Sequence, residues 1–200
     1  MKRLLLTVIF ALAALSAGAQ DTWDAGSWLD VHVTKSFGNA YAMAHAEHRS
    51  CAMFSATDAY FLMAGGGFRF TPFFNADLSY ERWGVGSDHT PFDKVVLSLT
   101  GTMRREDLSV PVREKVEFLV GGTPTLRSRL RAQYAPASSA LRPYAMAEVF
   151  TWDNWIRSLY YAGVDVRTGR HSSIDIYYLY HVPAAGVPCH IAGLGLNLTF

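Results

Sequence analysis

Charged and apolar residues alternate in two neighbouring runs between residues 112 and 134. In both runs nearly every second residue is polar, and the residues between them are mostly apolar. The charged positions are occupied by Arg113, Lys115, Glu117, Arg127, Arg129 and Arg131. A period of two is typical of a β-strand with one apolar and one polar face. The pattern therefore predicts a β-hairpin, and three arginines spaced two apart suit the water-filled inside of a barrel whose outside meets lipid.

The same alternation recurs along the chain, with almost no helical periodicity between the runs. The predicted strands cover residues 28–37, 40–49, 60–70, 75–83, 95–103, 112–120, 126–134, 141–152, 157–167, 173–181 and 192–200. Turn signals such as Gly38-Asn39 and Thr71-Pro72 separate them. The three glycines Gly65-Gly66-Gly67 predict a bulge or a sharp bend in the third strand.

These strands predict an all-β fold, a single antiparallel up-and-down transmembrane β-barrel of roughly ten to twelve strands. The connections alternate fairly well between short and long, as in barrels with short periplasmic turns and longer outer loops. Both ends of such a barrel usually lie in the periplasm, so we expect an even number of strands. Either one strand is missed or split, or residues 20–27 form part of another.

Composition supports a surface that meets lipid. Half of the residues are hydrophobic and 14% are aromatic, which is more than a secreted domain of this length needs for its core. No apolar run reaches about 18 residues, which excludes a helical membrane protein. Trp83, Trp152 and Trp155 lie at predicted strand ends, and Phe73 and Tyr134 lie at the opposite ends. Two such girdles are typical of membrane–water interfaces.

The first nineteen residues have the pattern of a secretory signal peptide. Lys2 and Arg3 precede an apolar run, and Ala17-Gly18-Ala19 offers small residues for cleavage after Ala19. Residues 20–200 then form one barrel domain. Cleavage removes two positive charges and changes the formal net charge from +1 to −1, which leaves no electrostatic argument for nucleic acid as a partner. The residue directly after the cleavage site is Gln20 and not a cysteine, so we do not expect a lipoprotein.

The last predicted strand ends on Phe200. An alternating terminal strand that ends in phenylalanine resembles the assembly signal of bacterial outer-membrane barrels. Together with the signal peptide, it predicts a location in the outer membrane. The expected partners are outer-membrane lipid and the barrel assembly machinery, which would recognise the strand that ends in Phe200.

Several short segments resemble one family of outer-membrane barrels. They are Val110-Pro111-Val112-Arg113-Glu114, Arg127-Ser128-Arg129, Tyr144-Ala145-Met146-Ala147-Glu148-Val149-Phe150 and Asp175-Ile176-Tyr177-Tyr178-Leu179. This pattern is similar to that of the family catalogued as domain of unknown function 2490, over most of the chain. The resemblance implies an outer-membrane β-barrel and no established activity.

A ladder of charged residues is the main candidate site. Its members are Arg113, Lys115, Glu117, Arg127, Arg129, Arg131, Glu148, Arg157 and Asp165. One interpretation is structural, because charged side chains can fill a narrow lumen by pairing across strands. The other is a selectivity surface or a site for an anionic ligand, since arginine suits carboxylate and phosphate. The structural interpretation is favoured because acids are available for pairing.

Histidines and cysteines supply the remaining candidates. His32, His45 and Glu47 can face the lumen on adjacent strands, and Asp175 and His181 share a face elsewhere. No serine has a motif that suggests a nucleophile, so we assign no catalytic residue, and we assign no metal site or cofactor.

Cys51 and Cys189 are the only cysteines, and both fall in predicted outer loops. In an oxidising compartment they are a candidate disulfide, with two free thiols as the alternative.

The expected function is that of a structural or narrow-pore outer-membrane barrel with a charged, largely filled lumen. One alternative is an outer-membrane hydrolase that acts at the outer rim. The other is a soluble secreted β-protein, in which the apolar face would be internal. The face that the apolar residues occupy distinguishes this last alternative from the first two.

Overall fold

Each of the alternating runs forms a β-strand in the computed structural model, which describes residues 24–52, 54–85, 90–152 and 154–200. The strands are β1 (Asp24–Phe37), β2 (Ala40–Cys51), β3 (Ala56–Thr71), β4 (Phe74–Val85), β5 (Thr90–Arg105), β6 (Leu108–Leu119), β7 (Thr125–Tyr134), β8 (Leu141–Trp152), β9 (Asn154–Arg167), β10 (Ser172–Pro183) and β11 (Cys189–Thr199). Their bounds differ from the predicted ones by a few residues. The expected signal peptide lies outside the described residues. The described part of the chain contains no helix long and apolar enough to cross a membrane.

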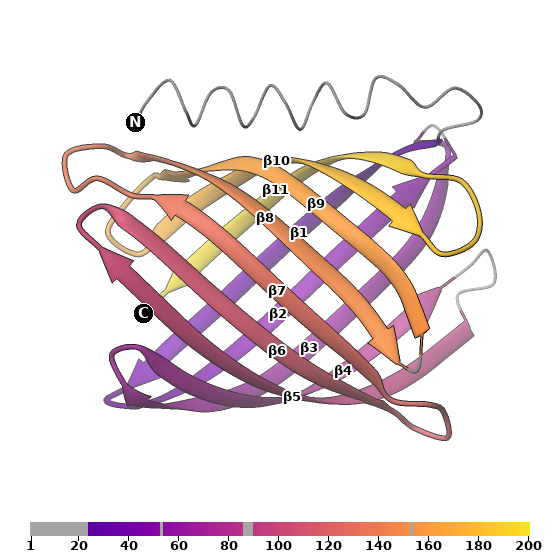
Figure 1. The fold of residues 1–200 in the computed structure, drawn as a ribbon, viewed down its shortest axis with the longest axis horizontal. Coiled ribbons are helices and arrows are strands. Elements are labelled where there is room, and N and C mark those ends of the chain that lie inside the picture. The colour runs from indigo at the N-terminus through magenta and orange to yellow at the C-terminus, as the bar shows by residue number, and fades with distance from the viewer. Residues whose placement is uncertain (1–23, 53, 86–89, 153) are drawn as a thin grey trace.

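The strands close into a barrel in which neighbours along the chain are neighbours in the sheet (Figure 1). This confirms the all-β up-and-down barrel. All pairs between consecutive strands are antiparallel, whereas β1 and β11 pair in parallel, from Asp24 beside Cys189 to Thr34 beside Thr199. The expectation of an even strand number is wrong. The first and last of eleven up-and-down strands point in the same direction, so only a parallel pair can close the barrel. Residues 24–27 belong to β1 and do not form part of a separate strand.

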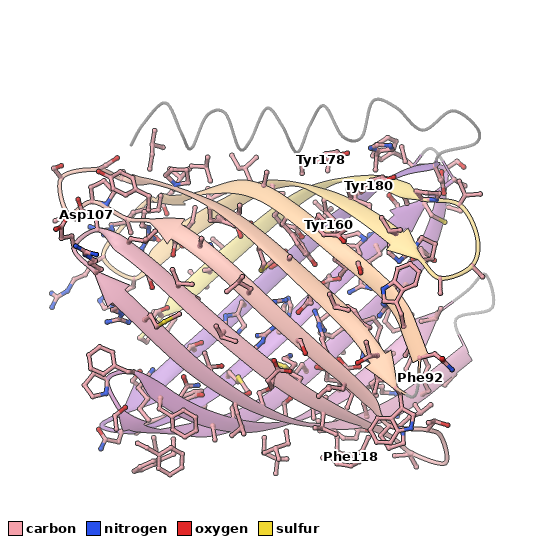
Figure 2. The ribbon with its side chains drawn as sticks, in the orientation of Figure 1. Phe92, Asp107, Phe118, Tyr160, Tyr178 and Tyr180 are labelled. Carbon is pink, nitrogen blue, oxygen red and sulfur yellow. The ribbon has the colours of Figure 1, made fainter. Side chains whose placement is uncertain are left out.

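The parallel closure gives the barrel two distinct ends. The starts of β1 and β11 lie at one end, which we name the cysteine rim because it carries Cys51 and Cys189. The other end carries Phe200, and we name it the carboxyl rim. In Figure 2 Asp107 lies at the carboxyl rim and Phe92 lies toward the cysteine rim.

The alternation of faces continues across the closing seam. Trp28 lies beside Gly193 and Asp30 beside Gly195, so that inward positions meet inward positions. The glycines leave space for large neighbours, because a Cβ at Gly193 would overlap the ring of Tyr177. One face of the sheet therefore lines the interior all the way around the barrel.

The three consecutive glycines of β3 do not form the expected bulge. The register with β2 and β4 runs through Gly65 and Gly67 without a shift. Shifts occur instead near the strand ends, for example between Arg49 and Ser50. The glycines provide space in the barrel wall, since a Cβ at Gly67 would overlap the ring of Tyr41. The prediction of a bulge was wrong because glycines inside a strand can also mark a place where neighbouring side chains approach the backbone closely.

Candidate functional site

The interior of the barrel is charged and its exterior is mostly apolar. Glu148 has 0% exposed surface, and Glu81 and Glu117 are buried as well. On the outside, large apolar side chains are exposed, and Leu62 reaches 59%. The exposed apolar residues include Leu29, Val31, Leu62, Leu78, Leu97, Leu99, Leu130, Ile176 and Leu194. Figure 2 shows Phe118 and Tyr178 projecting outward from opposite sides of the barrel.

Glu148 on β8 is the centre of the interior network. It accepts hydrogen bonds from Arg129 Nε at 2.6 Å, from Arg127 Nη2 at 2.7 Å and from Arg113 Nη2 at 3.5 Å. The register of the sheet brings these side chains together, because Arg129 lies directly opposite Glu148 on β8 and opposite Arg113 on β6. One buried carboxylate therefore accepts hydrogen bonds from three guanidinium groups.

A second carboxylate extends the network toward β5. Glu117 Oε2 accepts a hydrogen bond from Lys94 Nζ at 2.8 Å, and Glu117 Oε1 accepts one from Arg127 Nη1 at 3.4 Å. Arg127 thus joins Glu117 to Glu148. Lys94 is not among the predicted site residues, because the predicted fifth strand starts one residue after it. The alternation of inward and outward residues continues from Lys94 back to Phe92. A predicted strand extended along this alternation would have included Lys94.

The remaining arginines of the ladder pack on aromatic rings. The Arg131 guanidinium lies 3.7 Å from the centre of the Tyr144 ring, and that of Arg157 lies 4.1 Å from the centre of the Phe150 ring. These contacts are favourable cation–π geometry. Tyrosine and phenylalanine therefore supply part of the compensation that the sequence analysis attributed to acids alone.

Asp165 does not join the Glu148 network. It lies opposite Arg142 on β8, and Arg142 Nη2 is 3.1 Å from Asp165 Oδ2. Asp165 therefore forms an ion pair of its own, with an arginine that the predicted ladder did not include.

Lys115 differs from every other member of the ladder. Its side chain is only 9% exposed, and it lines the internal cavity. Within the described part of the chain it has no hydrogen bond and no ion pair with an acid. The residue opposite it on β5, Ser98, is also buried, and its Oγ lacks a hydrogen-bond partner.

The internal cavity has a volume of about 390 Å³. On its far side, β1 and β2 present Asp30, His32, His45 and Glu47, so the structure brings the predicted histidines together. His45 Nε2 lies 3.6 Å from Asp30 Oδ1 and 3.9 Å from Glu47 Oε2. In the described residues no group of three or more His, Cys, Asp or Glu side chains could hold a metal ion.

Asp175 and His181 do not form a joint site. Asp175 Oδ2 accepts a hydrogen bond from the Tyr144 hydroxyl at 2.9 Å. His181 lines a different pocket at the cysteine rim, together with Arg49 and Arg157. The shared strand face therefore does not produce an acid–histidine pair.

Cys51 and Cys189 are free thiols in the structure and do not form the candidate disulfide. Both line the pocket at the cysteine rim, but β1 lies between β2 and β11. Neighbouring strands are about 4.8 Å apart, so two strand ends on either side of a third are about 9.6 Å apart. This exceeds the usual Cα separation in disulfides, roughly 4.4 to 6.8 Å. The structure therefore agrees with the alternative of two free thiols.

The tryptophans differ in exposure. Trp152 and Trp155 are 41% and 45% exposed and lie near the cysteine rim. Trp83 is not part of a girdle, because it is only 6% exposed and lies inside the barrel. Its ring stacks on Phe61, with ring centres 4.4 Å apart. Position at a strand end therefore did not determine whether the ring is exposed.

No protein-family model matches this chain, and none of the curated proteins is significantly similar to it in sequence.

Proposed function

We propose that this protein is an outer-membrane β-barrel whose lumen is largely closed by paired charged side chains. The observation that carries the proposal is the inversion of polarity between the buried Glu148 network and the exposed outer leucines. In water, an exposed apolar surface around a whole barrel would favour association, since monomeric soluble proteins rarely expose patches above a few hundred Å². In a lipid bilayer the same surface is favourable.

The closed sheet also fits a membrane setting. All strands pair with two neighbours, so no sheet edge is left. A barrel without edges is one of the two structures that satisfy all backbone hydrogen bonds in hydrocarbon. The resemblance to the family of domain of unknown function 2490 implies the same location, and we include it in the proposal.

The terminal strand supports the proposed assembly route. Phe200 continues the pairing of β11 with β1, because its backbone N–H donates to the Thr34 carbonyl oxygen at 2.9 Å. Its ring is exposed and stacks on His171, with ring centres 5.8 Å apart. A recognition element for the assembly machinery has to be accessible in this way at the end of the barrel.

We expect the mature protein, cleaved after Ala19, to fractionate with the outer membrane and to migrate differently on gels before and after boiling in detergent. The physical reason is that a closed barrel resists unfolding by detergent at low temperature. Removal of Phe200 should reduce the amount of assembled, heat-modifiable protein several-fold. Removal of the exposed residue Val187 from the last loop is the control and should have little effect. Recovery of intact mature protein in the soluble periplasm would refute the proposal.

We also expect low conductance in planar bilayers. Barrels of sixteen or more strands leave an aqueous channel, whereas an interior of this size is filled by its side chains. Arg129→Ala removes one guanidinium group from the Glu148 network and should raise the leak current. Leu130→Ala, on the outer face of the same strand, should leave the current unchanged. A large, stable conductance in the unmodified protein would show that the lumen is open.

A further inference from the structure

Inside the barrel, Lys115 and Asp30 lie on opposite walls, and neither forms an ion pair between a lysine or arginine and a carboxylate among the described residues. Lys115 on β6 and Arg131 on β7 have no carboxylate oxygen within 4.0 Å among the described residues. β1 carries Asp30 and is the strand farthest from β6 and β7. Four strands separate it from β7 in one direction, and four separate it from β6 in the other.

Three aspartates of the cavity, on β1, β4 and β10, lack a lysine or arginine partner, and His45 Nε2 lies 3.6 Å from one of them, Asp30. Asp30, Asp77 and Asp175 have no lysine or arginine nitrogen within 4.0 Å in the described part of the chain. Each accepts a hydrogen bond from a tyrosine hydroxyl instead, at 3.4, 3.3 and 2.9 Å respectively. The donors are Tyr177, Tyr41 and Tyr144. A neutral hydroxyl positions a carboxylate without neutralising it.

Both groups line the same cavity of about 390 Å³. This volume is within the range of small-molecule sites, roughly 300 to 1,000 Å³. A simple anion in the cavity would meet three unpaired carboxylates, and a simple cation would meet Lys115 and Arg131. A molecule that carries both charges at opposite ends can satisfy both walls.

We propose that the cavity binds a small zwitterion, with its carboxylate or phosphate group toward Lys115 and its ammonium group toward Asp30. The burial of Lys115 without a partner is the observation that points to a ligand. It is buried to more than nine tenths, it lines the cavity, and nothing described in the chain pairs with it. Burial of an unpaired ammonium group is costly, and a bound anionic group offsets that cost.

Trp28 and Trp83 also line the cavity, so binding should change the tryptophan fluorescence of the protein. The inference rests on the proposed function in one respect, which is that charged side chains close most of the lumen, and it adds that the remaining cavity can be reached from a rim. It does not depend on the membrane location, because binding can be measured on the folded protein in detergent micelles. Soluble fractionation or a large conductance would therefore refute the proposed function without deciding this inference.

The test is titration with ω-amino acids from glycine to 6-aminohexanoate, followed by tryptophan fluorescence and calorimetry. We expect one member of this series to bind at least tenfold more tightly than the carboxylate and the amine of the same chain length, such as butanoate and butylamine for 4-aminobutanoate. Equal binding of the carboxylate alone or the amine alone would overturn the proposal, and so would the absence of binding by every member of the series.

Two variants from opposite walls make the test specific. Lys115→Gln and Asp30→Asn should each weaken binding of the best ω-amino acid by at least tenfold. Lys35→Gln on the outer face and Asp107→Asn in a turn are the matched controls and should leave binding unchanged. A difference in gel migration before and after boiling shows which variants fold. If only one of Lys115→Gln and Asp30→Asn folds, that variant alone is sufficient for the test. Unchanged binding in a folded Lys115→Gln or Asp30→Asn variant would refute the proposal.

Discussion

Glu148→Gln is expected to destabilise the folded barrel by about 3 to 5 kcal/mol, the usual cost of removing one partner from a buried ion pair. The carboxylate has no exposed surface and accepts hydrogen bonds from Arg113, Arg127 and Arg129. Glutamine keeps the shape of the side chain and removes its charge, so three guanidinium groups lose their shared partner. Urea unfolding of the protein in detergent micelles measures the change in the free energy of unfolding.

Two further variants show whether charge is the cause. Glu114→Gln, on the outer face of β6, replaces a glutamate whose Oε2 accepts one hydrogen bond from Ser128 Oγ at 2.6 Å. It should cost about 1 kcal/mol or less, as expected for one hydrogen bond. The double variant Glu148→Gln/Arg129→Gln should recover part of the stability, because it leaves one cation fewer without a partner. A Glu148→Gln protein as stable as the unmodified one would contradict the central role of this residue.

An arginine in the middle of the outer apolar surface is expected to cost roughly 2 to 4 kcal/mol in a lipid bilayer. Leu97 is the position to change, because it is 42% exposed and lies near the middle of β5. Leu97→Arg places a charge where the proposal has hydrocarbon. The free energy of unfolding should be measured with the protein folded into phospholipid vesicles.

Met103→Arg is the matched control for this experiment. Met103 lies on the same face of the same strand, is 64% exposed and is close to the carboxyl rim. The cost of a charge falls to about 0 to 1 kcal/mol near the membrane interfaces, so this variant should be much less affected. Equal costs at Leu97 and Met103 would argue against a bilayer around the barrel.

The strands and their two faces were predictable from the sequence. The alternation of Arg129, Leu130 and Arg131 reports a period of two directly, and this period is a local property of the backbone. The strand bounds were less exact, and Lys94 was missed for that reason. Position at a strand end, however, did not reveal that Trp83 is buried while Trp152 is exposed.

The closure of the barrel could not be predicted in the same way. Whether β1 meets β11, and in which direction, depends on pairing between residues far apart in the chain, such as Asp24 and Cys189. The rule that outer-membrane barrels have an even strand number suggested the wrong answer. The position of β1 between the two cysteines follows from this pairing, and so does the absence of a disulfide.

The sequence by itself determined that the chain is all β, where its strands lie, and that one face of the hairpin is cationic. Only the tertiary structure decided that Glu148 serves three arginines, that Lys115 is left without a partner and that Asp30 lies on the opposite wall. The reason is that alternation is set by neighbouring residues along one strand. Which charges meet inside the barrel is set by register and closure, which combine strands from the whole chain.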